Sequence, residues 1–466
     1  ELNIPKGDIL DQFRKDVNDG KLPTVSWLMT PANFSDHPGV PWFGSWFVSE
    51  VMEILTKNPE VWKKTIFVLT YDENDGYFDH VPPFVSTHPF KENAGKMSAG
   101  LNPKLDFVTK DAQTNPSMKE DRIRESQIGL GYRVPMMIIS PWTRGGYVCS
   151  EVFDHTSSLQ FLENFLERKF NKNIKEDNIT PWRRAICGDL TSAFRPYRGE
   201  PVEQPQFLDK TAFMQTIYSA KFKEEPDNFK PLNVEEVALI NKNSAASPDF
   251  PQQEKGTRMA CALPYELYVN GEHENGKYRI DFSAANKQFG KKSAGSPFIV
   301  YAQNPFKAEP LKVWDYTVSA GDTIYDEWQV SDFQNGEYHL HVHGPNGFFR
   351  SFKGTQDNPP VSVLIRYEEN SSKPGKLTGN VIVTIVNKSN HPEEILIRDV
   401  SYKASPKRLK VAAKGRNSMK LDLKSNHNWY DFVVEVTGYK AFQEQFAGRV
   451  ETGELTKTDP LMGQMV

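Results

Sequence analysis

An internal repeat in the C-terminal half of the chain limits the fold more than any other feature of the sequence. The segment YHLHVHGPNGFFRSFKG, which starts at Tyr338, aligns with YDFVVEVTGYKAFQEQFAG, which starts at Tyr430. Each copy has a strand-like run, a glycine turn and the spacing Phe-x3-Phe-x-Gly. This spacing falls on Phe348, Phe352 and Gly354 in the first copy and on Phe442, Phe446 and Gly448 in the second. We therefore predict two consecutive β-sandwich domains, residues 262–369 and 374–460, each of about 95 residues and seven antiparallel strands.

The N-terminal part of the chain, residues 1–200, has a different texture, in which short apolar runs alternate with amphipathic segments. The runs TVSWLMT, KTIFVLTY and RVPMMIIS are predicted as strands, and FGSWFVSEVMEILTKNP and TSSLQFLENFLERKF as helices. Strands that alternate with helices along the chain usually pair in parallel. We therefore predict an α/β domain with a parallel sheet in this region.

Several boundaries within this pattern can also be predicted. Asp154 or Thr156 is the expected N-cap of the second helix. A polar loop at residues 82–127 interrupts the alternation of strands and helices. Residues 201–261 form an irregular connector, in which VEEVALINKNSA is the segment expected to be helical.

The composition excludes several classes of protein. A chain of 466 residues with 38% hydrophobic residues has room for about three domains. Its net charge of -4, with acidic and basic residues mixed, argues against nucleic acid as a partner. No apolar run approaches the roughly 20 residues of a transmembrane helix. Cys149, Cys187 and Cys261 are too few for a disulfide framework, but they leave room for one bridge and one free thiol.

Acidic residues follow directly on the predicted strand KTIFVLTY, in the stretch DEND at residues 72–75. Ligands of open α/β sheets bind at the carboxyl ends of the parallel strands, and clustered carboxylates are stable when a cation lies between them. A solvated turn is the alternative interpretation of DEND by itself. Two other predicted strands also end in polar loops, which contain His37 and Arg144, and His155 follows the second of them. This pattern predicts a site for a metal and a phosphate ester.

Four segments of this region resemble the phosphoesterase family of the alkaline phosphatase superfold, specifically bacterial phosphocholine-preferring phospholipase C. They are SWLMTPANFSDHPG, TYDENDGYFDHVPP, GLGYRVPMMIISPWTRGG and VFDHTSSLQFLENF. The segments PQQEKGTRMACALPYEL and HVHGPNGFFRSFKG resemble the two C-terminal domains of the same enzymes. The resemblance covers nearly the whole chain. It implies hydrolysis of the phospholipid phosphatidylcholine to diacylglycerol and phosphocholine by a secreted or periplasmic bacterial enzyme.

The resemblance also implies the roles of three residues. Asp72 and Glu73 match the acidic pair that binds the metal, and His37 matches a histidine that contacts the substrate phosphate. The family's Asn-containing metal motif and its Ser or Thr nucleophile are not recognisable here. The resemblance therefore implies that the chain begins partway through the catalytic domain and is inactive without the missing N-terminal part, its expected partner. The resemblance does not identify the metal ion. Oxygen ligands suit calcium, magnesium or manganese, and a histidine from the missing part would allow zinc or iron.

Other residues near these motifs are candidates for binding the substrate. Aromatic faces attract the quaternary ammonium of choline, and histidine and arginine can contact its phosphate. The candidates are Trp42, Tyr77 and Phe78 for choline and His80, Arg144 and His155 for the phosphate. Core packing, loop bracing and simple solvation are the alternative roles. For Trp46 and Phe47, which lie on the apolar stripe of a predicted helix, core packing is the better interpretation.

The run HLHVH places His339, His341 and His343 on one face of a strand. A His-x-His pair can bind a transition metal. No carboxylate or cysteine with ligand spacing accompanies these histidines, so we predict a solvent-facing or turn-bracing role.

Two other functions stay open at this point. A phosphomonoesterase of the same superfold, similar to the acid phosphatases, would share the metal chemistry but would lack aromatic residues for choline. A non-catalytic module, whose two β domains bind a lipid surface, a glycan or a protein partner, would need no active site. Assays with a phosphomonoester and a phosphocholine diester would separate the two enzymes, and an upstream sequence without an α/β half-domain would favour the binding module.

Overall fold

Two compact units make up the protein, as seen in a computed structural model. The structure describes residues 8–34, 41–77, 79, 81–113, 119–199, 201, 210–225, 227, 229–243 and 256–461. The first compact unit, unit 1, comprises Glu1–Asp75, Val134–Gly145 and Phe194–Gln204. The second, unit 2, comprises Gly76–Arg133, Gly146–Ala193 and Pro205–Val466. The region predicted as one α/β domain is thus divided between the two units.

Unit 1 contains three α-helices, one short 3-10 helix at Ala32–Phe34 and a pair of strands in its described residues. The α-helices and strands are α1 (Asp11–Asn18), α2 (Pro41–Thr56), α3 (Pro59–Trp62), β1 (Phe67–Thr70) and β4 (Met136–Ile139). Helix α2 forms where the sequence predicts a helix, and Phe47, Val51, Ile54 and Leu55 are buried along one side of it. This spacing of three and four residues forms one apolar stripe, which packs with buried residues of the α1 region into a small core.

The prediction of parallel pairing is wrong for the two strands that unit 1 forms in its described residues. β1 and β4 pair antiparallel, with Phe67 opposite Ile139 and Thr70 opposite Met136. The chain leaves β1 at Thr70 and, after residues 71–135, enters β4 beside the same residue. A parallel pair would require the connection to cross to the other end of β1, usually through a helix. The described residues of unit 1 therefore form helices and a short antiparallel pair of strands, and not the predicted parallel sheet.

The prediction of a strand in TVSWLMT, residues 24–30, is also wrong. This segment has no strand assignment in the structure, and Trp27 and Met29 are 71% and 88% exposed. A strand requires a neighbour for its backbone N–H and C=O groups. β1 and β4 are paired with each other, and no described strand pairs with residues 24–30.

Unit 2 combines helices and short strands with a large β region. Outside the β repeats its described elements are β2 (Phe107–Val108), α4 (Lys110–Gln113), β3 (Ser126–Gln127), α5 (His155–Phe170), α6 (Pro181–Ile186), α7 (Lys210–Ala220), α8 (Val234–Lys242), β5 (Met259–Ala260) and β20 (Thr456–Lys457). Asp154 is the N-cap of α5, as predicted, and its carboxylate accepts a hydrogen bond from the Thr156 N–H at 2.9 Å. No helix within the described residues has the length and apolar character needed to cross a bilayer.

The connector at residues 201–261 is more helical than the sequence suggests. Helix α8 lies within the predicted segment VEEVALINKNSA, and Asn233 caps it in a reciprocal box with Glu236. Helix α7, in contrast, was not predicted. Its sequence, KTAFMQTIYSA, has little amphipathic contrast, and its described side chains are largely exposed.

The β region consists of two copies of one seven-stranded sandwich. Residues 256–461 are all described, and the first copy contributes β6 (Leu267–Glu274), β7 (Lys277–Ala284), β8 (Ser296–Ala302), β9 (Val313–Val318), β10 (Asp322–Gln329), β11 (Glu337–His343) and β12 (Phe349–Thr355). The second contributes β13 (Val361–Glu369), β14 (Leu377–Asn387), β15 (Glu393–Asp399), β16 (Lys407–Val411), β17 (Arg416–Leu421), β18 (Trp429–Val436) and β19 (Gln443–Arg449). Three strands of each copy form one sheet, and four form the other.

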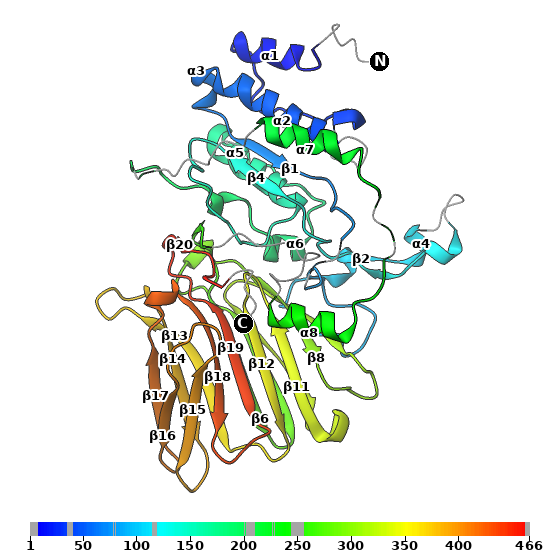
Figure 1. Ribbon diagram of the computed structural model, residues 1–466. Coiled ribbons are helices and arrows are strands. Elements are labelled where there is room, and N and C mark those ends of the chain that lie inside the picture. Colours follow the sequence, from blue (N-terminus) through cyan, green and yellow to red (C-terminus); the bar gives the residue numbers. More distant parts are fainter. Residues whose placement is uncertain are drawn as a thin grey trace. The chain divides into compact units, whose positions relative to one another are not determined.

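The two copies are joined edge to edge through their last strands. β12 pairs antiparallel with β19, so the two four-stranded sheets become one eight-stranded sheet, in the order β16-β15-β18-β19-β12-β11-β8-β9 (Figure 1). Alternate residues of these strands point into one hydrophobic core that extends through both copies. The two sandwiches predicted from the sequence therefore share a sheet and a core.

The boundary between the copies differs from the one expected at residues 370–373. β13 pairs with β14, so it is the first strand of the second copy. The run NSSKPGK forms the turn of this hairpin, in which the Asn370 N–H donates to the Lys376 carbonyl at 2.7 Å. A turn rich in Ser, Pro and Gly can end a domain or join two strands, and the sequence does not distinguish these two roles.

Residues 94–98, within the predicted polar loop at residues 82–127, pack along the edge of the eight-stranded sheet. The Asp315 N–H donates to the Ala94 carbonyl at 3.0 Å, and the Thr317 N–H donates to the Lys96 carbonyl at 3.1 Å. Gly95 lies between these contacts at a φ of +111°, and an added Cβ would lie 2.0 Å from the Asp315 carbonyl oxygen. Only glycine fits this close approach, which covers the exposed edge of β9.

A buried carboxyl at the junction of the two copies makes the stability of the β region depend on pH. Glu444 is 3% exposed, accepts a hydrogen bond from the Tyr278 hydroxyl at 2.9 Å, and has a pKa that burial raises to about 8. The folded protein therefore retains this proton to a higher pH than the unfolded chain does, in which the pKa is about 4.3. The stability from this group is fully present below the unfolded pKa and is lost as the pH rises through about 8.

We expect Glu444→Gln to flatten this dependence. Glutamine keeps an acceptor for Tyr278 but cannot ionise. From pH 5 to pH 8.5 the free energy of unfolding should therefore fall less in the variant than in the wild type. At about 1.4 kcal/mol per pKa unit, this difference amounts to up to a few kcal/mol. Urea unfolding at a series of pH values measures this difference. The other acids whose pKa burial raises, such as Glu151 and Asp315, are present in both proteins and serve as an internal control. Parallel curves for the two proteins would contradict the assignment.

Candidate active site

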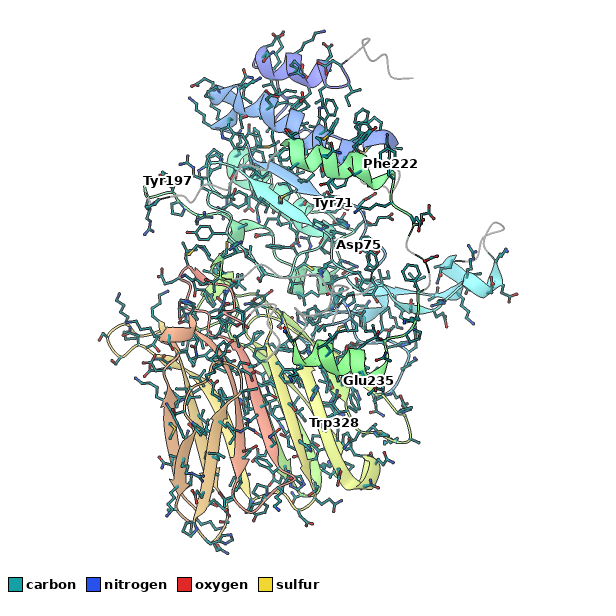
Figure 2. The ribbon with its side chains drawn as sticks, in the orientation of Figure 1. Tyr71, Asp75, Tyr197, Phe222, Glu235 and Trp328 are labelled. Carbon is teal, nitrogen blue, oxygen red and sulfur yellow. The ribbon has the colours of Figure 1, made fainter. Side chains whose placement is uncertain are left out.

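The acidic stretch after β1 is exposed, as an ion-binding loop requires. Asp72, Glu73 and Asp75 are exposed, and Asn74 is half-buried. The Glu73 N–H donates to Asp72 Oδ1 at 3.0 Å, which directs the Asp72 side chain along the loop. Figure 2 shows Tyr71 and Asp75 just beyond the carboxyl end of β1. The predicted strand and its acidic end are thus both present in unit 1.

These carboxylates fit part of the ligand shell of a divalent cation. Carboxylate oxygens suit hard cations such as calcium, magnesium and manganese. Asp72 and Glu73 would supply two of the ligands. Within the described residues, no three His, Cys, Asp or Glu side chains are grouped closely enough to hold a metal ion together. The pair alone therefore identifies neither a complete site nor a particular metal.

Arg144 follows the other end of the β1–β4 pair. Because the two strands are antiparallel, the residues after Ile139 lie beside Phe67, whereas Asp72 follows Thr70 at the opposite end. The Arg144 guanidinium lies over the Tyr197 ring, 4.2 Å from its centroid. Figure 2 shows Tyr197 and Asp75 on opposite sides of the strand pair. The parallel sheet that would have placed Arg144 near the acidic stretch does not form between these strands.

In unit 2, the Asp154-His155 motif contributes to a buried ionic cluster. Arg183, on α6, contacts the Asp154 carboxylate, donates to the Gly129 carbonyl at 2.7 Å, and lies 3.3 Å from Asp106 Oδ1. The Asp106 side chain is 1% exposed and that of Asp154 is 5% exposed. Burial raises the pKa of Asp106 above its usual value, and Arg183 partly opposes this effect. His155 is the exposed first residue of α5.

The aromatic candidates differ in exposure. Tyr77, in unit 2, is 77% exposed, and Trp42, in unit 1, is 47% exposed, so both rings offer surface to a ligand. Phe47 is buried, as expected for a residue of the α2 stripe. The prediction of core packing is wrong for Trp46, which is 46% exposed and packs against Phe34 with ring centroids 5.7 Å apart. Three predicted site residues, His37, Phe78 and His80, lie outside the residues that the structure describes.

The three histidines of β11 are half-buried, and two of them, His339 and His341, form side-chain hydrogen bonds. His339 Nε2 lies 2.9 Å from His341 Nε2 and 3.1 Å from the Ser351 hydroxyl on β12. Burial lowers the pKa of His341 to about 4, so its imidazole is neutral at pH 7. No acidic or thiol ligand joins them in the described residues. These contacts support the bracing role, here between β11 and β12.

Ionic residues that no sequence pattern predicted hold α5 and α6 together. Besides Arg183, these are Arg184 and Glu163: Arg184 Nη2 donates to Glu163 Oε1 at 2.8 Å, and this bond together with the Glu176 N–H lowers the Glu163 pKa to about 2. Each partner lies many residues away along the chain. No local spacing rule brings such residues together, so no sequence signal identified them.

Two family models match parts of this chain. Residues 1–167 match the model of the Phosphoesterase family. Residues 259–355 and residues 361–449 each match the model of the bacterial phospholipase C C-terminal domain. The two latter matches begin and end close to the two structural copies of the β sandwich.

Curated relatives match nearly the whole chain. The non-hemolytic phospholipase C of Pseudomonas aeruginosa is 37% identical over 470 residues, which cover 97% of this chain and 60% of the relative. That of Burkholderia pseudomallei is 34% identical, with 98% and 59% covered. The hemolytic phospholipase C of Pseudomonas aeruginosa is 33% identical, with 97% and 59% covered. The chain thus spans about 60% of the length of these relatives. In the order of its parts the chain is similar to these phospholipases, because a segment similar to the Phosphoesterase family precedes two segments similar to the bacterial phospholipase C C-terminal domain.

Proposed function

We propose that the protein hydrolyses the phosphodiester bond of phosphatidylcholine and releases phosphocholine and diacylglycerol. The observation that supports this most strongly is the 37% identity over 97% of the chain to a non-hemolytic phospholipase C. The order of the parts, a Phosphoesterase segment followed by two phospholipase C C-terminal domains, supports the same function. We further propose a secreted or periplasmic location, in which the enzyme meets phospholipid outside the cytoplasm.

In the proposed site, Asp72 and Glu73 hold a divalent cation. A bound cation of this kind would neutralise the non-bridging oxygens of the phosphate. Both carboxylates are exposed beside a strand end, within the matched residues 1–167, and this supports the assignment. His37 contacts the phosphoryl group in this proposal, where a histidine could transfer a proton to the leaving oxygen.

The exposed rings of Trp42 and Tyr77 are the described candidates for holding choline, with Phe78 beside them in the sequence. His80 and His155 are the further candidates for the phosphate. Arg144 is left out of the proposed site because it follows the other end of the β1–β4 pair and stacks on Tyr197. We also propose that the hydroxyl nucleophile, the other metal ligands and the parallel sheet belong to the part of the relatives that this chain does not cover.

We expect the protein expressed from its complete gene to release phosphocholine from phosphatidylcholine vesicles, with at least tenfold lower rates on phosphatidylglycerol vesicles and on p-nitrophenyl phosphate. The reason is that the glycerol head group and the monoester both lack the quaternary ammonium that aromatic rings attract. Chromatographic measurement of phosphocholine, with the released nitrophenol read by absorbance, tests this expectation.

The same assay separates the other two functions. Hydrolysis of p-nitrophenyl phosphate without phosphocholine release would favour the phosphomonoesterase. Binding to sedimented vesicles without hydrolysis of any substrate would favour the non-catalytic module. Either result would overturn the proposed function.

A further inference from the structure

Two of the three cysteines lie opposite each other on neighbouring backbone segments of unit 2. Val148 and Ala260 form a parallel bridge, in which the Val148 N–H donates to the Met259 carbonyl at 2.9 Å and the Cys261 N–H donates to the Val148 carbonyl at 2.8 Å. The next residue on each segment is a cysteine, Cys149 on one and Cys261 on the other. Directly opposed residues of paired strands therefore carry two thiols on the same side of the ladder.

This arrangement meets the geometric requirement of a disulfide. Paired strands lie about 4.8 Å apart, and disulfides bridge Cα atoms that are roughly 4.4 to 6.8 Å apart. The two thiols already contact each other: a hydrogen bond between Cys149 and Cys261 is the main cause that raises the Cys149 pKa well above its usual value. All three cysteines are free thiols in the structure.

The surroundings separate this pair from the third cysteine. Cys261 is 3% exposed, and Cys149 packs against the core of the β sandwich with its sulfur 3.3 Å from the Ser192 hydroxyl. Cys187 belongs to a different small core, with Trp182 and Ile186. Cys187 therefore provides a built-in comparison for a buried cysteine in the same protein.

We propose that Cys149 and Cys261 form a disulfide, which ties the segment before α5 to the strand that leads into the first β copy. The proposal goes beyond the hydrolytic function and does not depend on it. Three cysteines allow at most one disulfide, which the proposal assigns to Cys149 and Cys261, and Cys187 then remains a free thiol.

The oxidant in this reaction is a disulfide donor, such as oxidised glutathione or a protein disulfide. The thiolate of one cysteine attacks a sulfur of the donor, which gives a mixed disulfide and releases one donor thiolate. The thiolate of the second cysteine then attacks the protein sulfur of the mixed disulfide and releases the other donor thiolate. The two thiol protons pass to the released thiolates, so the donor is reduced to two thiols and the protein loses two hydrogens.

The raised pKa and the burial of Cys149 indicate when the bridge forms. The thiolate is the attacking species, and both effects reduce its population in the folded protein. Exchange should therefore be slow once unit 2 is folded and fast while the two segments are still accessible. The bridge closes the chain from Cys149 to Cys261, a long loop that contains α5, α6, α7 and α8, so it restricts the unfolded chain strongly.

Peptide mapping tests the proposal directly. The protein is refolded in a mixture of reduced and oxidised glutathione, denatured, alkylated with iodoacetamide without reductant, and digested. We expect one linked peptide pair that contains Cys149 and Cys261, an alkylated Cys187, and an intact protein two hydrogens lighter than the reduced form. Alkylation of all three cysteines, or a bridge that includes Cys187, would overturn the proposal.

Matched variants and a proteolytic nick give a second test. Cys187→Ser should keep the bridge, and Cys149→Ser and Cys261→Ser should each lose it. In wild type and Cys187→Ser, dithiothreitol should lower the melting temperature by several degrees, and the other two variants should not respond. After limited trypsin cleavage at the exposed Lys221 or Lys223, the fragments should stay together on a denaturing gel until reductant is added. Fragments that separate without reductant would contradict the bridge, whatever the folding of the variants.

Discussion

Replacement of Arg183 by methionine is expected to lower the free energy of unfolding of unit 2 by about 3 to 5 kcal/mol. The Arg183 side chain is 16% exposed and contacts two carboxylates, Asp106 and Asp154, whose side chains are 1% and 5% exposed. Methionine has a similar volume but leaves both acids without their cation in a place that water does not reach. The loss of the hydrogen bond to the Gly129 carbonyl adds to this cost. Urea unfolding of the wild type and the variant at pH 7 measures the difference.

The pH dependence of Arg183→Met distinguishes lost electrostatics from lost packing. Burial already raises the pKa of Asp106, and without the opposing effect of Arg183 it should rise further above that in the unfolded state, so the folded variant binds more protons. Its stability should therefore be present at low pH and be lost as the pH rises. The difference in free energy of unfolding between wild type and variant should therefore be smaller at pH 5 than at pH 7. Arg168→Met, at an exposed arginine of α5, is the matched control and should change stability by less than about 0.5 kcal/mol. An equal gap at both pH values would assign the loss to packing alone.

Loss of the acidic pair is expected to have the largest effect on activity. In the protein expressed from its complete gene, Asp72→Asn or Glu73→Gln should each lower phosphocholine release by about 10² or more, because the site loses a charged ligand for the cation. Metal content, measured by mass spectrometry after dialysis, should fall in parallel with turnover. The circular dichroism spectrum should not change, because both side chains are exposed and belong to no core.

The control for this experiment is Glu60→Gln, at an exposed carboxylate of α3 that forms a surface ion pair with Lys63. This variant should keep both metal and turnover. If Asp72→Asn and Glu73→Gln also keep both, the stretch DEND is a solvated turn. If they lose turnover but keep the metal, the two carboxylates act on the substrate and not as ligands.

The β region was the most predictable part of the fold, because its signals are local and occur twice. Alternation in YHLHVH and YDFVVEV specifies which side chains enter the core, and Tyr338 and Tyr430 are both buried. The copy number follows from the spacing of the phenylalanines. The edge pairing of β12 with β19 could not be predicted, because a strand pattern specifies which side faces the core but not which strand lies next to it.

The α/β region was less predictable, because the direction of strand pairing depends on what lies between the strands. The order of strands and helices suggested a parallel sheet, but residues 71–135 pass through unit 2 and return to the end of β1 that they left. In the candidate site, the sequence predicted the strand that precedes the acidic stretch, and β1 forms there, while the metal-binding role of Asp72 and Glu73 stays a prediction. It placed Arg144 beside that stretch only because it assumed parallel strands, and it missed Arg183, whose two partners lie far away in the chain.

The pairing of β12 with β19 has a consequence for how such a protein can have arisen. A single copy of the sandwich would expose its last strand as an open edge, and two identical molecules could then associate through those edges with two-fold symmetry. Gene duplication would convert that dimer, whose population falls on dilution, into an internal contact with a high effective concentration. The two copies of the sandwich could then acquire different residues around the former symmetry axis. Arg350 and Glu444 occupy equivalent positions of the two copies and are both buried there, yet one is a base and the other an acid. A symmetric ancestor would have had to bury like residues at these positions, so this asymmetry became available only after the two copies shared one chain.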